Sequence, residues 1–183
     1  DSLPDAVAEA IREAGWSLEI LEYGFPGRQR YTPYDYRDAL ARASFAVFLS
    51  ATESQGLALA EAWMMGVATL VYDQGYMDEG GRRYVPSDAA PYLTYRTGAK
   101  FHSVEELRGI LANLEAYREL WSPRAWAVRH LTDEAASMQV LRVLSCLARD
   151  QRHRMAPPPP PPTAAGEEAA AEEAAAEEAA AEE

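Results

Sequence analysis

Cysteine, paired histidines and long apolar runs are scarce in this sequence, and each scarcity excludes a class of protein. Cys146 is the only cysteine, so no disulfide can form within the chain. No apolar run approaches the ~20 residues that a membrane-spanning helix needs. The three histidines are scattered and lack the spacing of zinc ligands. We therefore expect no internal disulfide, no transmembrane segment and no zinc site.

Motifs for cofactors and metal ions are also missing. The sequence has neither the Gly-x-Gly-x-x-Gly fingerprint of dinucleotide binding nor the lysine-serine phosphate loop. It contains no Asp-x-Asp pair, so metal-dependent sugar transfer is not supported. We expect no cofactor and no metal ion. The lack of a disulfide is compatible with the cytoplasm, which is the predicted location, and a peripheral position at a membrane is left open.

The acidic charge of the chain comes mostly from its C-terminal end. The formal net charge is -12, and eight of the glutamates lie at or after Glu167. Without these eight charges the rest of the chain carries only -4. A body that is mildly acidic predicts neither a nucleic-acid partner nor a polybasic membrane patch.

Composition also separates a body from a tail. Six consecutive prolines occupy residues 157–162, and a repeat of two glutamates and three alanines runs from Glu167 to the end. The proline run favours extended polyproline II, and the Glu/Ala repeat has high helix propensity but no apolar face to bury. We divide the chain into a domain at residues 1–154 and a low-complexity tail at residues 155–183. The tail is expected to be a solvated spacer, with partner binding as the alternative.

The apolar pattern of the body alternates between helices and strands. Wholly apolar runs at residues 45–49 and 67–72 suit strands that are covered on both faces, as in a parallel sheet. Cys146 lies in an apolar series at helical spacing, which predicts a buried thiol. The remaining predicted elements are strands at residues 17–23 and 99–101, a polar loop at 73–91, and helices at 2–15, 34–43, 57–65, 103–117, 122 onward and 132–152. This order predicts an α/β fold with a Rossmann-like parallel sheet flanked by helices.

The most informative segment follows the apolar run at residues 45–49 and opens a predicted helix. Ligands of α/β sheets bind at such a strand-to-helix junction. Glu53 lies in the junction and Glu61 lies about one turn into the helix. Between them, the N–H groups around Gln55, Gly56 and Leu57 are helix N-terminal donors, which favour an anionic group. Glycine at this place lets such a group approach the backbone closely.

The segment resembles a known family. Glu53, seven residues and Glu61 match the E-x7-E signature of retaining glycosyltransferases with two Rossmann-like domains, the group 1 type with the GT-B fold. The stretch from Glu53 to Val67 looks like the usual sequence of their C-terminal, donor-binding domain, and the likeness runs from about Ser17 to Leu144. The resemblance implies transfer of a sugar from a nucleoside-diphosphate sugar to an unknown acceptor.

The resemblance also implies roles for individual residues. Glu53 would contact the hydroxyls of the donor sugar as the catalytic position, and Glu61 would hold the ribose hydroxyls. The backbone between them would face the diphosphate and sugar, and a preceding loop would border the nucleobase. The residues of these two segments are Ser54, Gln55, Gly56, Leu57 and Ala58, and Tyr23, Gly24 and Phe25.

Parts of the family pattern are absent. Ala68 stands where the family usually has proline, which is tolerable. The region that supplies the basic clamp for the diphosphate is missing together with the first strand, and Arg28 and Arg30 are better interpreted as surface charges. The N-terminal, acceptor-binding domain is missing too. We therefore expect this chain to be incomplete at its N-terminus and inactive in sugar transfer by itself.

Two other interpretations remain open at this point. The chain can be a non-catalytic Rossmann-like module that binds a nucleotide or serves as a scaffold. Alternatively, Glu53 caps the helix and Glu61 is a solvated helical charge. Against the second interpretation, Glu61 has apolar neighbours along the sequence, where a buried carboxylate would need a partner.

Removal of residues 156–183 is expected to leave the fold intact, because the tail has no apolar surface to contribute to a core. Thermal unfolding of the full chain and of the truncated chain should give nearly the same Tm. A drop of many degrees after truncation would show that the tail packs on the body.

Overall fold

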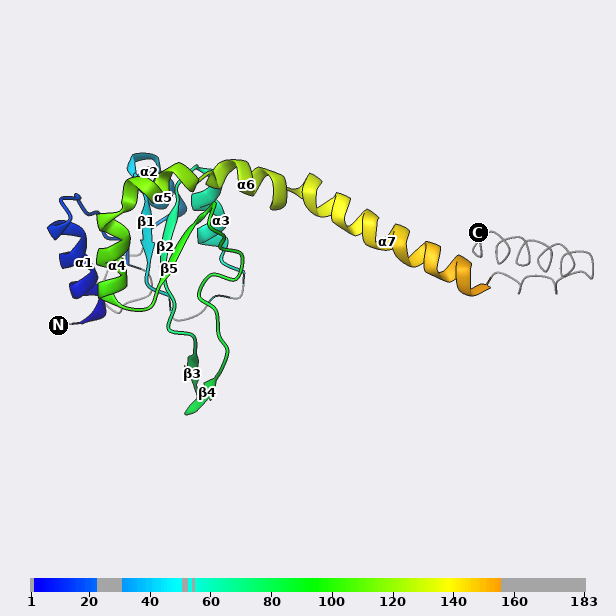
Figure 1. Ribbon diagram of the computed structural model, residues 1–183, viewed down its shortest axis with the longest axis horizontal. Helices are drawn as coiled ribbons and strands as arrows, with labels where there is room; N and C mark the ends of the chain where they lie inside the picture. The colour runs from blue at the N-terminus through cyan, green and yellow to red at the C-terminus, as the bar shows by residue number, and fades with distance from the viewer. Residues whose placement is uncertain (1, 23–30, 51–52, 54, 156–183) are drawn as a thin grey trace, which may run out of the picture. The chain divides into compact units, whose positions relative to one another are not determined.

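The computed structural model describes residues 2–22, 31–50, 53 and 55–155 (Figure 1). The chain divides into two units, Asp1–Met138 and Gln139–Glu183, and the sheet and the candidate site belong to the first. The helices described are α1 (Leu3–Glu13), α2 (Pro33–Arg42), α3 (Leu57–Met64), α4 (Val104–Ala112), α5 (Leu114–Leu120), α6 (Pro123–His130) and α7 (Asp133–Met155). The strands described are β1 (Ala46–Phe48), β2 (Thr69–Tyr72), β3 (Met77–Glu79), β4 (Arg82–Tyr84) and β5 (Gly98–Phe101).

Three of the strands form a parallel sheet in the order β1-β2-β5. Val47 is opposite Leu70 in the first pair, and Leu70 is opposite Ala99 in the second. The α/β prediction is confirmed, with strands at the two apolar runs and at residues 99–101, where they were expected. Among the described residues β1 is an edge strand, so the sheet is smaller than a full Rossmann-like sheet.

The helices cover both faces of this sheet, as Figure 1 shows. Leu70 packs with buried residues of α1 and α4, whereas Val71 packs with buried residues of α3 and α6. Both side chains have no exposed surface. Successive side chains of a strand point to opposite faces, so two neighbouring apolar residues require two covering layers.

The structure corrects three details of the prediction. Residues 17–22 form no strand, and Tyr23 lies outside the described residues. A strand needs a partner for its backbone groups, and no described segment pairs with residues 17–22. The polar loop at residues 73–91 contains a two-stranded antiparallel hairpin, β3–β4. The helix predicted at residues 103–117 is interrupted at Asn113, whose side-chain amide donates to the carbonyl of Gly109 at 2.9 Å.

The prediction of a buried thiol is wrong, because Cys146 is exposed on α7. Its apolar neighbours Val140, Val143 and Leu147 are also more than half exposed. The helical spacing of the apolar residues predicts the helix correctly, but such a pattern does not say which surface covers it. Within the part of the chain that the structure describes, none of the helices combines the length and apolar character that crossing a bilayer requires.

A substitution at Gly98 tests the pairing of β2 with β5. A Cβ atom at Gly98 would overlap the backbone carbonyl of Thr69 on the neighbouring strand, which cannot move aside. We expect Gly98→Ala to lower the free energy of unfolding by about 3 kcal/mol, at the upper end of overpacking costs. In Gly109→Ala, the control, the added Cβ meets no heavy atom within 4 Å. That substitution lies inside α4 and should raise the free energy of unfolding by about 0.5–1 kcal/mol. Equal midpoints of the two variants in urea would contradict the observed pairing.

Candidate functional site

The carboxyl ends of the parallel strands meet at one edge of the sheet, and the residues that follow β1 and β2 lie there. The E-x7-E segment follows β1 and leads into α3. Asp73 directly follows β2. This edge is the usual ligand-binding edge of an open α/β sheet.

Helix α3 is fastened to the sheet by its buried face. Trp63 is almost fully buried, and its indole N–H donates to the hydroxyl of Thr69 at 3.0 Å. The ring of Trp126 meets Trp63 edge to face, with the ring centroids 5.5 Å apart. A hydrogen bond and an aromatic contact to different elements hold the axis of α3 and thereby the position of its N-terminus.

The N-terminus of α3 begins with Gly56 in a left-handed conformation, at φ 65° and ψ 45°. Its N-cap provides no side-chain hydrogen bond, whereas Ser2, Thr32 and Ser103 cap α1, α2 and α4. The first intrahelical bond runs from the N–H of Ala60 to the carbonyl of Gly56 at 3.0 Å. The earlier N–H groups of the first turn therefore have no partner within the helix, and they lie at the positive end of the helix dipole.

Glu53 is half-buried at the same edge. Its backbone N–H donates to the carbonyl of Asp88 at 3.2 Å, and its carboxylate accepts from the hydroxyl of Ser50 at 3.5 Å. No hydrogen bond among the described residues joins this carboxylate to an N–H of α3. The interpretation of Glu53 as a helix cap is therefore not supported by the geometry.

Glu61 is exposed, together with Leu57 and Met64 on the same face of α3. The argument that this carboxylate needs a partner in an apolar neighbourhood is wrong, because the buried residues of α3 lie on the other face of the helix. The exposure of Glu61 agrees with the alternative interpretation of a solvated helical charge. The hydroxyl of Tyr36 donates to the carbonyl of Ala58 at 2.6 Å. Burial, and next the negative charge of Glu61, raise the pKa of Tyr36. Tyr36 of α2 is thus a neutral donor beside Glu61.

A second group of polar residues at this edge was missed by sequence reasoning. The ammonium of Lys100, on β5, contacts the carboxylate of Asp73 at 2.9 Å and that of Asp88 at 2.5 Å. Asp73 is buried and also accepts from the N–H of Gly75 at 3.0 Å. Asp88 also accepts from the N–H of Ala90 at 2.7 Å. The only lysine of the chain therefore joins two segments of the polar loop.

Burial disfavours the charged forms of Asp73 and Lys100, but the hydrogen bonds and the opposite charge of their partners outweigh this effect. Desolvation alone would raise the pKa of Asp73, but hydrogen bonds from Lys100 and Gly75, with the lysine charge, leave it below its usual value. Desolvation would likewise lower the pKa of Lys100, but the bonds to Asp88 and Asp73 leave it above its usual value. The side chains of Asp73 and Lys100 are therefore both charged at neutral pH.

Of these three residues, only Asp73 has a sequence pattern that could have predicted its place in the site. Asp73 directly follows a wholly apolar run, which places a carboxylate at the end of a buried strand. Lys100 is a single lysine in a short predicted strand, and Asp88 is one of several polar residues in a loop. Their meeting depends on the path of the loop, which no local pattern determines.

The remaining predicted site residues divide into two groups. Gln55 is exposed and Ala58 is half-buried at the start of α3. The other group lies outside the described residues and comprises Tyr23, Gly24, Phe25 and Ser54. Arg28 and Arg30, which were interpreted as surface charges, also lie outside the described residues. Among the residues that are described, no three His, Cys, Asp or Glu side chains are grouped so that they could hold a metal ion.

A groove of about 500 Å³ lies along β1. One wall comes from residues 16–19 and Leu21, another from α2, and the floor from residues 44–49. The groove therefore lies between an edge strand and an extended segment that pairs with no described strand.

Searches of protein families, of curated proteins and of solved structures found no significant match to this chain.

The lowered pKa of Asp73 predicts that this residue stabilises the folded protein less at acidic pH. Its pKa is lowered in the folded protein, so its contribution to stability is present above the unfolded pKa and is lost as the pH falls through the folded pKa. Asp73→Asn should be less stable than the wild type near neutral pH. The gap in unfolding free energy should shrink as the pH falls from about 5 to values below the usual aspartate pKa of about 3.9. A gap that stays constant over this range in urea titrations would contradict the ion pair.

Proposed function

We propose that this chain is the donor-binding part of a glycosyltransferase that transfers a sugar from a nucleoside-diphosphate sugar. The observation that carries the proposal is the N-terminus of α3. It lies at the carboxyl edge of a parallel sheet and starts at a left-handed glycine without a side-chain cap. Glu53 and Glu61 stand before and after it at the E-x7-E spacing.

Two kinds of groups at the carboxyl edge would bind different parts of the ligand: the N–H groups of α3 and the carboxylates of the glutamates. A diphosphate would meet the N–H groups of the first turn of α3, which favour negative charge. Carboxylates are acceptors only, so Glu53 and Glu61 suit the hydroxyls of the sugar and the ribose rather than the phosphates. Lys100 is already bound by two carboxylates, so it offers a diphosphate little positive charge.

The proposal includes a full Rossmann-like sheet and a second, acceptor-binding domain. A full Rossmann-like sheet would continue beyond β1, and the groove of about 500 Å³ on that side supports an additional strand there. The proposed partners are the nucleotide sugar and an acceptor-binding domain, and the proposed location is the cytoplasm. Chemistry between two domains would require the acceptor to be held in line with the donor, and such positioning is a large part of the rate. We therefore propose that residues 1–155 bind donor but transfer no sugar alone.

A non-catalytic nucleotide-binding module is the competing function. The two differ in what a complete protein does with bound nucleotide sugar. Transfer to an acceptor supports the enzyme, whereas binding without transfer or donor hydrolysis supports the module.

Glu61→Ala tests the ligand role of the exposed carboxylate. Calorimetry should show binding of one of the UDP, GDP or ADP sugars to the wild-type chain. The loss of a charged acceptor costs about 1.5–3 kcal/mol, so affinity should fall about tenfold or more. Glu9→Ala, which removes an exposed glutamate from the middle of α1, is the matched control and should leave affinity unchanged. Equal affinities of Glu61→Ala and Glu9→Ala, with both variants folded, would refute the role of Glu61.

A further inference from the structure

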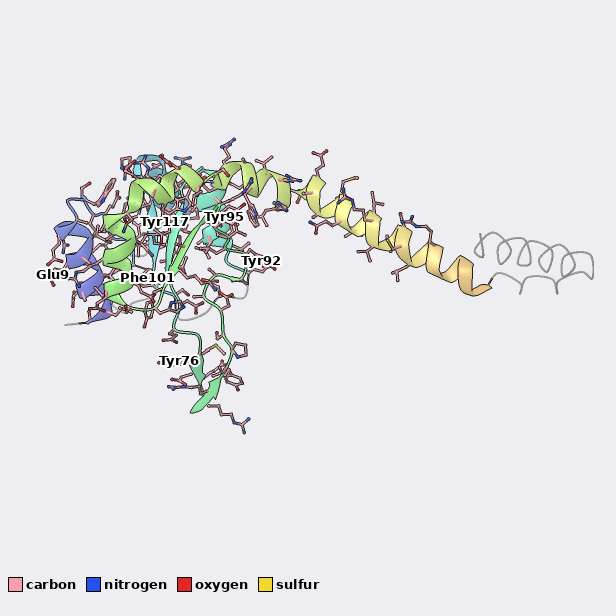
Figure 2. All side chains as sticks on the ribbon, viewed as in Figure 1. Glu9, Tyr76, Tyr92, Tyr95, Phe101 and Tyr117 are labelled. Atoms are coloured by element: carbon pink, nitrogen blue, oxygen red, sulfur yellow. The ribbon has the colours of Figure 1, made fainter. Side chains whose placement is uncertain are left out.

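The β3–β4 hairpin forms an arm that projects from the carboxyl edge of the sheet (Figure 1). We define the arm as residues 74–87. Figure 2 shows Tyr76 on the arm, whereas Phe101 lies within the body. The arm starts next to Asp73 and ends next to Asp88, the two residues whose carboxylates contact Lys100. One ammonium group therefore joins both ends of the arm to strand β5.

Contacts within the arm preserve its shape. The guanidinium of Arg83 donates to both carboxylate oxygens of Asp78 at 2.9 Å. The same guanidinium lies 3.9 Å from the centre of the Tyr76 ring. At the base, the N–H of Ser87 donates to the carbonyl of Gly75 at 3.1 Å. Because these contacts are internal, they do not orient the arm relative to the sheet. The arm is attached to strand β5 by the two bonds of Lys100 and by the N–H of Asp73, which donates to the carbonyl of Phe101 at 3.0 Å.

A short path leads from Lys100 to Glu53. The ammonium holds the side chain of Asp88, and the backbone carbonyl of Asp88 accepts the N–H of Glu53. The segment that carries Glu53 is thus attached to the base of the arm. A displacement of Asp88 would shift the arm and Glu53 together.

The ammonium of Lys100 is needed because one of its partners is buried. The side chain of Asp73 is only 9% exposed, and that of Lys100 is 27% exposed. A buried carboxylate that loses its counter-charge must move towards water or take up a proton. Either response would weaken the attachment of Asp73 and Asp88 to strand β5.

We infer that Lys100 is a positioning residue that fixes Glu53 and the arm in one geometry. It thereby controls recognition of the sugar part of the ligand and leaves recognition of the nucleotide part unchanged. The sugar part of this inference rests on the proposed function, in which Glu53 meets the sugar hydroxyls. The positioning part rests only on the contacts of Lys100, Asp88 and Glu53.

The first measurement is amide hydrogen exchange in the full chain. Lys100→Met keeps an unbranched side chain that is one atom shorter and removes the charge. The N–H groups of Glu53 and Ala90 should exchange about tenfold faster or more, because their acceptors belong to Asp88. Lys100→Arg retains the charge and should restore part of the protection. The matched control is Arg108→Met, which removes the exposed ion pair with Glu13 at 2.8 Å and should leave both amides unchanged.

The second measurement compares ligands. For the nucleotide that the wild type binds, the affinities of the nucleoside diphosphate and of the nucleoside-diphosphate sugar are measured by calorimetry. Lys100→Met should lose about tenfold in affinity for the nucleotide sugar and almost none for the nucleoside diphosphate. If Lys100→Met does not fold, Asp88→Asn replaces it, because that variant weakens one contact of Lys100 and keeps the other.

Each outcome decides a separate claim. Unchanged exchange at Glu53 and Ala90 would overturn the positioning role. Faster exchange with equal losses for both ligands would show a structural role only and would overturn the control of sugar recognition. If the wild type binds neither ligand, the proposed function fails and the sugar part fails with it. In that case the exchange at Glu53 still decides the positioning part.

Discussion

Strand β2 is apolar at successive positions, and it is stable in water only when both of its faces are covered. Leu70 is covered from one side by α1 and α4, and Val71 from the other by α3 and α6. The burial of one Leu or Val side chain contributes about 1.5–3 kcal/mol, which is a large part of a domain's net stability. The two helical layers and the parallel neighbours of β2 follow from this constraint.

Because both faces of the sheet are covered, polar functional groups are accessible mainly at its edges. Most side chains of the covered sheet are apolar, so polar groups gather mainly where the strands end. At that edge α3 presents its first-turn N–H groups, and Trp63 holds the helix in place through Thr69. Lys100 neutralises part of the charge of Asp73 and Asp88, which would otherwise repel each other at the base of the arm. The edge therefore combines carboxylate acceptors with backbone N–H donors.

Sequence reasoning recovered the elements that local pattern determines. The apolar runs before and after α3, the cap at Ser103 and the glycine at the start of α3 all correspond to observed features. Features that depend on distant contacts were not recovered. Residues 17–22 have a strand-like pattern but no described partner, and Cys146 has apolar neighbours that no described residue covers. The exposure of Glu61 likewise depends on which face of α3 packs on the sheet, and its neighbours along the sequence do not reveal that face.

The central claim is that the first turn of α3 binds the anionic part of a nucleotide sugar. The most direct test is a titration of the isotopically labelled chain with UDP, GDP and ADP sugars, followed by the NMR shifts of individual backbone amides. One of these ligands should shift the amides of Gln55, Gly56, Leu57 and Ala58 more than those of α1 and α4. If all three ligands leave these amides unchanged, or if the largest shifts lie away from the carboxyl edge of the sheet, the account is contradicted.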